Sequence, residues 1–125
     1  MIDHVSVGVR DLHRATAFYE AVLGTLGLQK LMEHAGAVGF GKNHAEFWLN
    51  HRPELPAPTE DNGCHICLRA ASTEKVDEFY ALAMSLGATS SGAPGLRPQY
   101  HDSYYACFIR DADGNHFEAV TFVQD

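Results

Sequence analysis

The stretch HVSVGV, residues 4–9, is followed 61 positions later by the similar stretch HICLRA, residues 65–70, which indicates that the chain repeats one structural unit. In the first copy, valines alternate with other residue types, which is typical of a β-strand that turns one apolar face toward a core. Apolar residues of the second copy fall at the same alternate positions. His4 and His65 head the two strands, so the repeat predicts that they occupy equivalent places in two related units.

A helical pattern follows each copy. Asp11 and Ser72 stand where each helix should begin and can accept hydrogen bonds from its first free amides, while Gly27 and Gly87 stand where each should end. The apolar residues recur with the spacing of a one-sided helix. They are Ala15, Phe18, Tyr19, Val22, Leu23 and Leu26 in the first copy, and Val76, Phe79, Tyr80, Ala83 and Met84 in the second.

The apolar period shortens after the first helix, which indicates strands. Residues 27–50 contain three candidate strands, broken near Ala35-Gly36 and at Lys42-Asn43. A linker with three prolines follows at residues 51–62. The sequence therefore predicts a first unit of the order β-α-β-β-β.

The second unit repeats this order with a longer loop, which we place at residues 90–103 because it holds two glycines and two prolines. A strand at residues 104–110 and a turn at Asp113-Gly114 lead into a last strand at residues 115–122. A loop of this length inside a compact domain is more often functional than decorative.

Composition limits the classes of function. The chain of 125 residues predicts one domain, divided into modules of about 1–58 and 59–125. A formal charge of −7 with no basic run argues against nucleic acid, and the absence of a long apolar run or a signal pattern predicts a cytoplasmic protein without a membrane span. We interpret Cys64, Cys67 and Cys107 as small core residues rather than a disulfide framework.

The two units, the paired histidines and RDADGNHFEAV at residues 110–120 together resemble the vicinal oxygen chelate superfamily. This group includes glyoxalase I, extradiol dioxygenases, fosfomycin-resistance thiol transferases and bleomycin-binding proteins. The resemblance covers essentially the whole chain. It implies an α+β fold in which two tandem β-α-β-β-β modules form a cupped mixed sheet with helices on the outside. It also implies a small-molecule substrate and a homodimer.

The resemblance places the metal ligands of the family at His4, His65 and Glu118. Two imidazoles and one carboxylate would leave open positions on zinc, nickel, manganese or iron for an oxygen substrate, and Glu118 is then also a candidate catalytic group. The alternative is a metal-free cup in which the same three residues are ordinary hydrogen-bonded polar groups.

One ligand of glyoxalase I has no counterpart. Aligning the last strands of the two units places Trp48 opposite Glu118, where glyoxalase I has a second glutamate. Glu46 lies two residues earlier on the same strand face, about 6–7 Å away, and is either a substitute ligand or a solvated carboxylate. Ser6 matches a hydroxyl of the fosfomycin-resistance transferases, but this chain lacks their basic cluster after the last ligand, and it has two units where dioxygenases typically have four.

Further candidates lie around the expected site. His101 is a candidate proton shuttle, Tyr100 and Tyr104 are candidates to close over a substrate, and Arg69 shares a strand face with His65 and is a candidate anion anchor. The other histidines carry no recognisable spacing, and we interpret them as background: His13, His34, His44, His51 and His116.

Two classes of function follow. The first is a metal-dependent enzyme of glyoxalase type, a lyase or isomerase, that activates a small oxygenated and possibly thiol-linked substrate, with a dioxygenase or a thiol transferase as alternatives within the superfamily. The second is a bleomycin-resistance-type binding protein, in which Trp48 and the tyrosines stack on a planar ligand.

Overall fold

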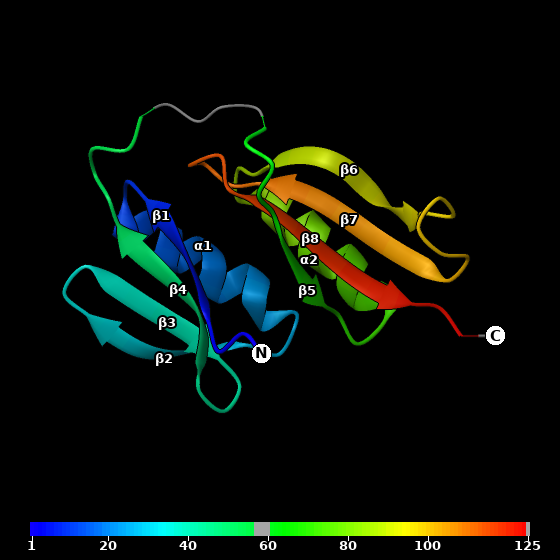
Figure 1. Cartoon of the computed structure of the whole chain (residues 1–125), viewed down its shortest axis with the longest axis horizontal. Coiled ribbons are helices and arrows are strands. Elements are labelled where there is room, and N and C mark those ends of the chain that lie inside the picture. Colours follow the sequence, from blue (N-terminus) through cyan, green and yellow to red (C-terminus); the bar gives the residue numbers. More distant parts are fainter. Residues whose placement is uncertain (57–60, 125) are drawn as a thin grey trace. The chain divides into compact units, whose positions relative to one another are not determined.

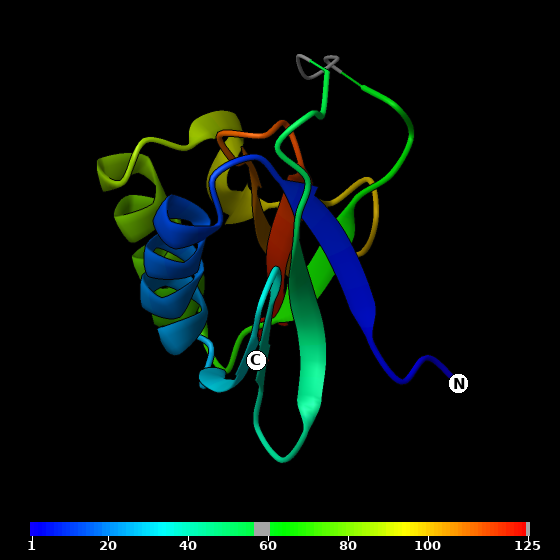
Figure 2. The ribbon, with the colours of Figure 1, turned by 90° about the vertical axis from the view of Figure 1, so that its left-hand side faces the viewer.

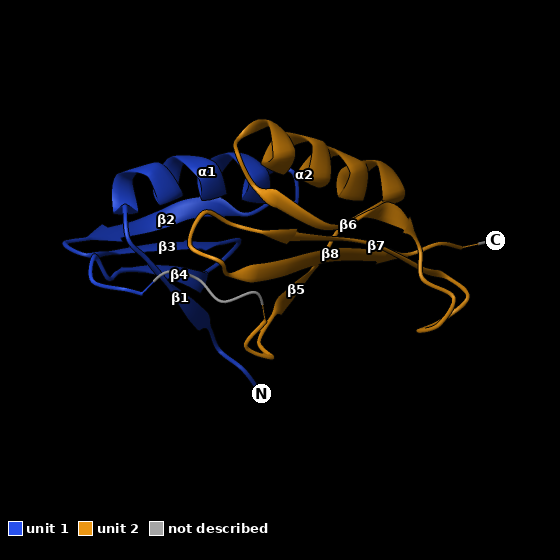
Figure 3. Cartoon of the chain, turned by 90° about the horizontal axis from the view of Figure 1, so that it is seen from above, with its two compact units in different colours: residues 1–57 blue, residues 58–125 orange. Residues whose placement is uncertain are grey.

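The computed structural model describes residues 1–56 and 61–124. The chain forms two compact units, Met1–Ala57 and Pro58–Asp125 (Figure 3). The predicted module boundary between residues 58 and 59 lies outside the described residues. Neither helix in the described ranges has the length and apolar content needed to cross a lipid bilayer.

The first unit is a four-stranded mixed sheet with one helix (Figure 1). The spatial order of its strands is β1-β4-β3-β2. The first pair is parallel and the other two pairs are antiparallel. Its elements are β1 (Val5–Val9), α1 (Leu12–Gly24), β2 (Gln29–His34), β3 (Ala37–Gly41) and β4 (Ala45–His51).

The second unit has the same element order and an equivalent strand order, β5-β8-β7-β6, with β5 parallel to β8. Its elements are β5 (Ile66–Arg69), α2 (Thr73–Ser85), β6 (Thr89–Leu96), β7 (Tyr104–Arg110) and β8 (His116–Phe122). The predicted α+β fold of two β-α-β-β-β modules is therefore confirmed.

The predicted helix ends are also confirmed. The Asp11 carboxylate accepts a hydrogen bond from the backbone N–H of Arg14 at 3.0 Å, and Ser72 caps α2 in the same way. Beyond the helices, Gly27 and Gly87 have φ angles of 84° and 97°. Glycine adopts this left-handed conformation without steric cost, so the chain can turn from each helix into the strand that follows it.

Each sheet buries one face under its own helix (Figure 2). Tyr19 of α1 contacts Phe47 of β4, with ring centroids 5.2 Å apart. Phe117 of β8 is likewise buried. Because side chains alternate across a strand, Trp48 and Glu118 project from the opposite, open faces of their sheets. These open faces carry the predicted site residues.

The long loop predicted in the second unit is wrong for its first half, residues 90–96, and correct for its second half. Strand β6 extends to Leu96, so only residues 97–103 connect β6 to β7. The strand tolerates Pro94 because it lies at the sheet edge, and its register shifts between Ser90 and Gly92 and again between Gly92 and Gly95.

The interpretation of all three cysteines as core residues is correct for Cys107 only. Cys107 is buried, whereas Cys64 and Cys67 are exposed. Cys67 alternates with Ile66 and Leu68 along β5, which puts it on the open face of the sheet with the candidate site.

Candidate functional site

The open face of the second sheet brings side chains from three adjacent strands into one row. The registers place Cys67 of β5, Glu118 of β8 and Phe108 of β7 directly beside one another. His65 immediately precedes β5 and shares the face of Cys67. The strand pairing thus brings the two predicted ligands of this unit together.

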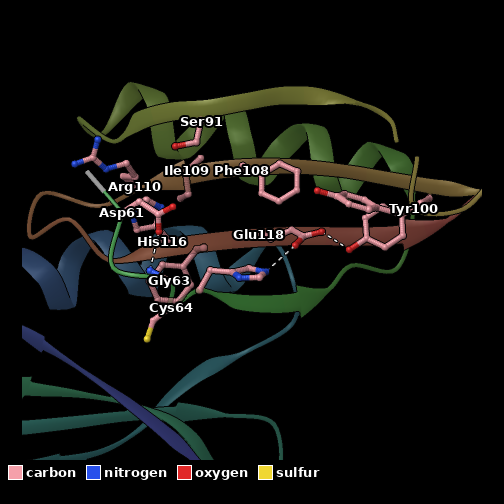
Figure 4. A pocket seen from close by; sticks show the side chains of 13 residues that line it. Asp61, Gly63, Cys64, Ser91, Tyr100, Phe108, Ile109, Arg110, His116 and Glu118 are labelled. Carbon is pink, nitrogen blue, oxygen red and sulfur yellow. Dashed lines mark hydrogen bonds and ion pairs between the residues drawn. The ribbon is translucent and has the colours of Figure 1, made fainter. Parts of the chain in front are cut away.

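Glu118 is held at both carboxylate oxygens (Figure 4). His65 Nε2 lies 3.2 Å from Oε1, and the Tyr104 hydroxyl donates a short hydrogen bond to Oε2. Burial, reinforced by the bond to Glu118, raises the pKa of the Tyr104 hydroxyl, which therefore remains a donor at neutral pH. Glu118 itself is 3% exposed, so its carboxylate has a fixed orientation.

This buried carboxylate has no Lys or Arg partner in the described part of the chain; its ion-pair partner there is His65. A buried carboxylate is unfavourable unless it is paired, hydrogen-bonded or bound to a metal. Two adjacent ligand atoms, each bound to the same divalent ion at about 2.0–2.2 Å, lie about 3 Å from one another. The 3.2 Å separation of His65 Nε2 and Glu118 Oε1 fits such a cation as well as it fits a hydrogen bond.

A cleft of about 880 Å³ opens beside this pair. His65, Tyr104 and Glu118 line it. Its other walls include Asp61, Ser91, Tyr100, Phe108, Arg110 and His116. A volume of this size is within the range of small-molecule sites.

Cys67 is a site residue that the sequence interpretation missed. Burial of its sulfur, and then the neighbouring Glu118 charge, raises the pKa of this thiol to about 12, although the residue as a whole is exposed. The thiol is therefore neutral near pH 7. Its position two residues after His65, equivalent to Ser6 in the first unit, is the sequence signal that could have identified it.

An aromatic cluster borders the site at the end of β8. Tyr104 contacts Tyr100 and Phe122 edge to face, with centroids 5.2 and 5.4 Å away. The Arg69 guanidinium lies over the Phe122 ring at 4.9 Å. His101 packs against the same ring at 6.1 Å and is not a lining residue of the cleft. Tyr100 and Tyr104 line the cleft, so the structure brings these two predicted residues to the site.

In the first unit, His4 pairs with a neighbouring acid. Its Nδ1 lies 2.7 Å from the Asp3 carboxylate, and His44 Nε2 lies 3.8 Å from the other oxygen of that carboxylate. The hydrogen bond to His4 is the main reason that the pKa of Asp3 is lowered. A carboxylate on Nδ1 leaves Nε2 available as a ligand nitrogen, an arrangement common among metal-binding histidines.

Trp48 fills the position in the first sheet that Glu118 fills in the second. Trp48 pairs with Ser6 as Glu118 pairs with Cys67. Its indole stacks on His34, with ring centroids 5.8 Å apart and planes 10° apart, and a Cβ at Gly39 would be 3.0 Å from it. The open face at this point is therefore aromatic. Glu46 is half-buried two residues earlier on the same face.

No three His, Cys, Asp or Glu side chains within residues 1–56 and 61–124 gather into a group that could hold a metal ion. His65 and Glu118 come from one unit and His4 comes from the other. The second unit thus brings together two of the three predicted ligands.

Comparisons with known proteins show which family this chain belongs to. A crystal structure of a glyoxalase/bleomycin resistance protein from Albidiferax ferrireducens T118 is 32% identical, with a TM-score of 0.83 over 94% of this chain and 96% of that one. A glyoxalase/bleomycin resistance protein/dioxygenase family enzyme from Burkholderia phytofirmans PsJN is 20% identical, with a TM-score of 0.75 over 98% of each chain. A search among curated proteins found no match.

A mutant of the genomically encoded fosfomycin resistance protein FosX from Listeria monocytogenes has the same fold. Its structure, complexed with Mn(II) and a dihydroxypropylphosphonic acid, is 19% identical, with a TM-score of 0.72 over 98% of this chain and 90% of that one. The sequence model of one family matches residues 1–119 and confirms the resemblance noted above. The chain therefore belongs to the Glyoxalase/Bleomycin resistance protein/Dioxygenase superfamily.

Proposed function

We propose that this protein is a divalent-metal-dependent enzyme of glyoxalase type, a lyase or isomerase that acts on a small oxygenated, possibly thiol-linked substrate. The observation that carries the proposal is the buried Glu118 carboxylate, which faces His65 on one oxygen and Tyr104 on the other. Such a carboxylate, with no Lys or Arg partner among the described residues, is suited to a cation.

The proposed ligands are His65, Glu118 and His4. His4 belongs to the first unit, whereas His65 and Glu118 belong to the second. His4 would therefore come either from the same chain or from the second chain of a homodimer. Zinc, nickel, manganese and iron all accept two imidazoles and one carboxylate. When bound, such a metal would act as a Lewis acid toward a substrate oxygen.

The protein's own groups would prepare this site. Tyr104 holds one oxygen of Glu118, so the other oxygen is oriented toward His65. Phe108 gives the cleft an apolar wall that limits water, and Tyr100 stands at its rim with 61% exposure. Glu118 is the candidate group to exchange a proton with the substrate, and His101 would act only if its loop moved toward the cleft.

The other proposed substrate contacts lie on both open faces. Arg69 would attract an anionic group, because its guanidinium rests on Phe122 rather than on an acid. In the first unit, Ser6, Glu46 and Trp48 share one face and would contact the substrate if that face meets the cleft.

The FosX complex supports metal use among proteins with this fold, since that protein was crystallised with Mn(II). At 19% identity it does not select the reaction. Dioxygenase and thiol-transferase chemistry remain alternatives within the superfamily.

A second candidate function is a metal-free binding protein of the bleomycin-resistance kind. The stacked Trp48 and His34 rings favour it, because together they form an aromatic surface suited to a planar ligand. Elemental analysis of protein purified without chelator separates the two functions. The enzyme requires about one divalent ion per chain, and protein that contains no metal and takes up none on addition of Mn(II), Ni(II) or Zn(II) would favour the binding protein.

A further inference from the structure

The cleft contains a pair of nitrogen-bearing side chains that the proposed metal site does not use. Arg110 of β7 and His116 of β8 are directly opposed in the antiparallel register, and both line the cleft. Figure 4 shows them at the end of the cleft away from Tyr100, with Glu118 between. His116, interpreted above as background, therefore lies two residues from Glu118 on the same strand face.

Both side chains have a buried nitrogen without a hydrogen-bond partner. Among the described residues, the buried side-chain nitrogen and oxygen atoms without a hydrogen-bond partner are Arg110 Nε and His116 Nε2. Leaving a buried donor unsatisfied costs about 1–3 kcal/mol, and native structures contain few such groups. Two of them lie on opposed residues that line one cleft, and a ligand acceptor would satisfy both once the side chains turn toward the cleft.

The chemistry of the pair defines that acceptor. Arg Nε–H can only donate, and His116 Nε2 donates in the tautomer that has its hydrogen on Nε2. We propose that Arg110 and His116 form a subsite for a carboxylate group of the substrate, whose two oxygens can accept from one donor of each residue. This proposal deepens the proposed function, since it makes the substrate a small oxygenated acid.

The negative charges of the cleft favour a carboxylate over a phosphonate. Asp61 and Glu118 both line the cleft. The Asp61 carboxylate accepts the Gly63 N–H at 2.7 Å and forms no ion pair with Arg110 within residues 61–124. Since like charges repel, a singly charged carboxylate suits this surrounding better than a doubly charged phosphonate.

A nearby arginine is already engaged. Arg97 donates to the Ala93 and Gly95 carbonyl oxygens at 2.7 and 2.9 Å and lies over the Phe108 ring at 5.4 Å. Arg110 is therefore the cleft arginine that remains available to a ligand. Two strand positions span about 6–7 Å, so one small molecule can reach both His116 and the oxygens of Glu118.

Ligand-observed NMR titration of the metal-free protein tests the subsite without relying on a metal. The probes are levulinate, a short keto acid, its neutral amide, and methylphosphonate. The variants are Arg110→Gln and His116→Asn, two independent removals of one donor each, and Arg14→Gln is the matched control because Arg14 is an exposed arginine on α1.

Levulinate is expected to bind saturably and to lose at least about tenfold in affinity in Arg110→Gln and in His116→Asn, as the loss of a hydrogen bond to a charged group predicts. Arg14→Gln should bind it normally, and the amide should not bind. Equal levulinate affinity in the wild-type protein and both cleft variants, no saturable binding, or tighter binding of methylphosphonate would overturn the proposal. Mn(II) binding is measured separately. Levulinate binding without Mn(II) binding would contradict the metal site alone. Mn(II) binding without levulinate binding would contradict the subsite alone.

Discussion

The Tyr104 hydroxyl donates a hydrogen bond to Glu118 Oε2 and leaves Oε1 of the same carboxylate facing His65 Nε2 at 3.2 Å. The carboxylate is thus oriented by one residue of β7 and one residue that precedes β5. Tyr104 is itself braced by Phe122, so its hydroxyl has little freedom to leave. This relationship makes Tyr104 a positioning residue for the proposed metal ligand.

Tyr104→Phe should weaken Mn(II) affinity by about 10- to 100-fold, because residues that orient a metal ligand typically contribute that much. Calorimetric titration measures it. Tyr105→Phe is the matched control, since the Tyr105 hydroxyl donates to Asp77 at 2.7 Å and does not contact Glu118. Equal affinities in the two variants would contradict a positioning role for Tyr104.

Gly39→Ala should disturb the Trp48 indole. A Cβ at residue 39 would lie 2.8 Å from Ala45 Cβ and 3.0 Å from the indole, so the ring or the strand must move. We expect a shifted tryptophan emission spectrum and a loss of about 1–3 kcal/mol in the free energy of unfolding. Trp48 is the sole tryptophan, which makes the spectrum specific.

Gly24→Ala is the control for that substitution. A Cβ at Gly24 meets nothing within 4 Å, and Gly24 ends α1, so alanine should be neutral or stabilise the protein by about 0.4–1 kcal/mol. If Gly39→Ala behaved like this control, Trp48 would not lie against Gly39.

The repeat predicted the fold because it carries several independent signals. His4 and His65 mark equivalent strands, while the capping residues Asp11 and Ser72 mark equivalent helix starts. The failure at β6 has a physical cause: Pro94 and two glycines are usually excluded from strands, but an edge strand with an interrupted ladder accepts them.

The site was only partly predictable. The resemblance to the superfamily assigned His65 and Glu118 to one ligand set, and the structure brings them together. Alternation along each strand could then have placed Cys67 on the face of His65 and His116 on the face of Glu118. The unsatisfied nitrogens of Arg110 and His116 could not be predicted, because hydrogen-bond satisfaction depends on what every neighbouring strand presents.

Cys67 should react slowly with iodoacetamide despite its exposure. Because its pKa is raised to about 12, the reactive thiolate is scarce at pH 8 and becomes abundant only as the pH approaches 12. Alkylation of the chelator-treated protein, mapped by mass spectrometry, should be far slower at Cys67 than in a small free thiol at pH 8. Glu118→Gln should accelerate it modestly, since the Glu118 charge is secondary to burial. Rapid labelling of wild-type Cys67 at pH 8 would contradict the raised pKa of its thiol.

A homodimer is expected because the edge strands β2 and β6, each at the end of its sheet, expose unpaired backbone groups. Light scattering should give twice the chain mass of 13.7 kDa. A mass that stays at the single-chain value at high protein concentration would contradict the dimer.

The proposed metal centre is tested by calorimetric titration of Mn(II), Ni(II) and Zn(II) into wild-type, His65→Ala and Glu118→Ala protein. We expect stoichiometric binding by the wild-type protein and its loss in both variants, because each substitution removes one of the proposed ligands. Trp48→Phe should retain binding, since the indole stacks on His34 and is not a proposed ligand. Unchanged metal binding by Glu118→Ala would contradict a metal centre built on Glu118.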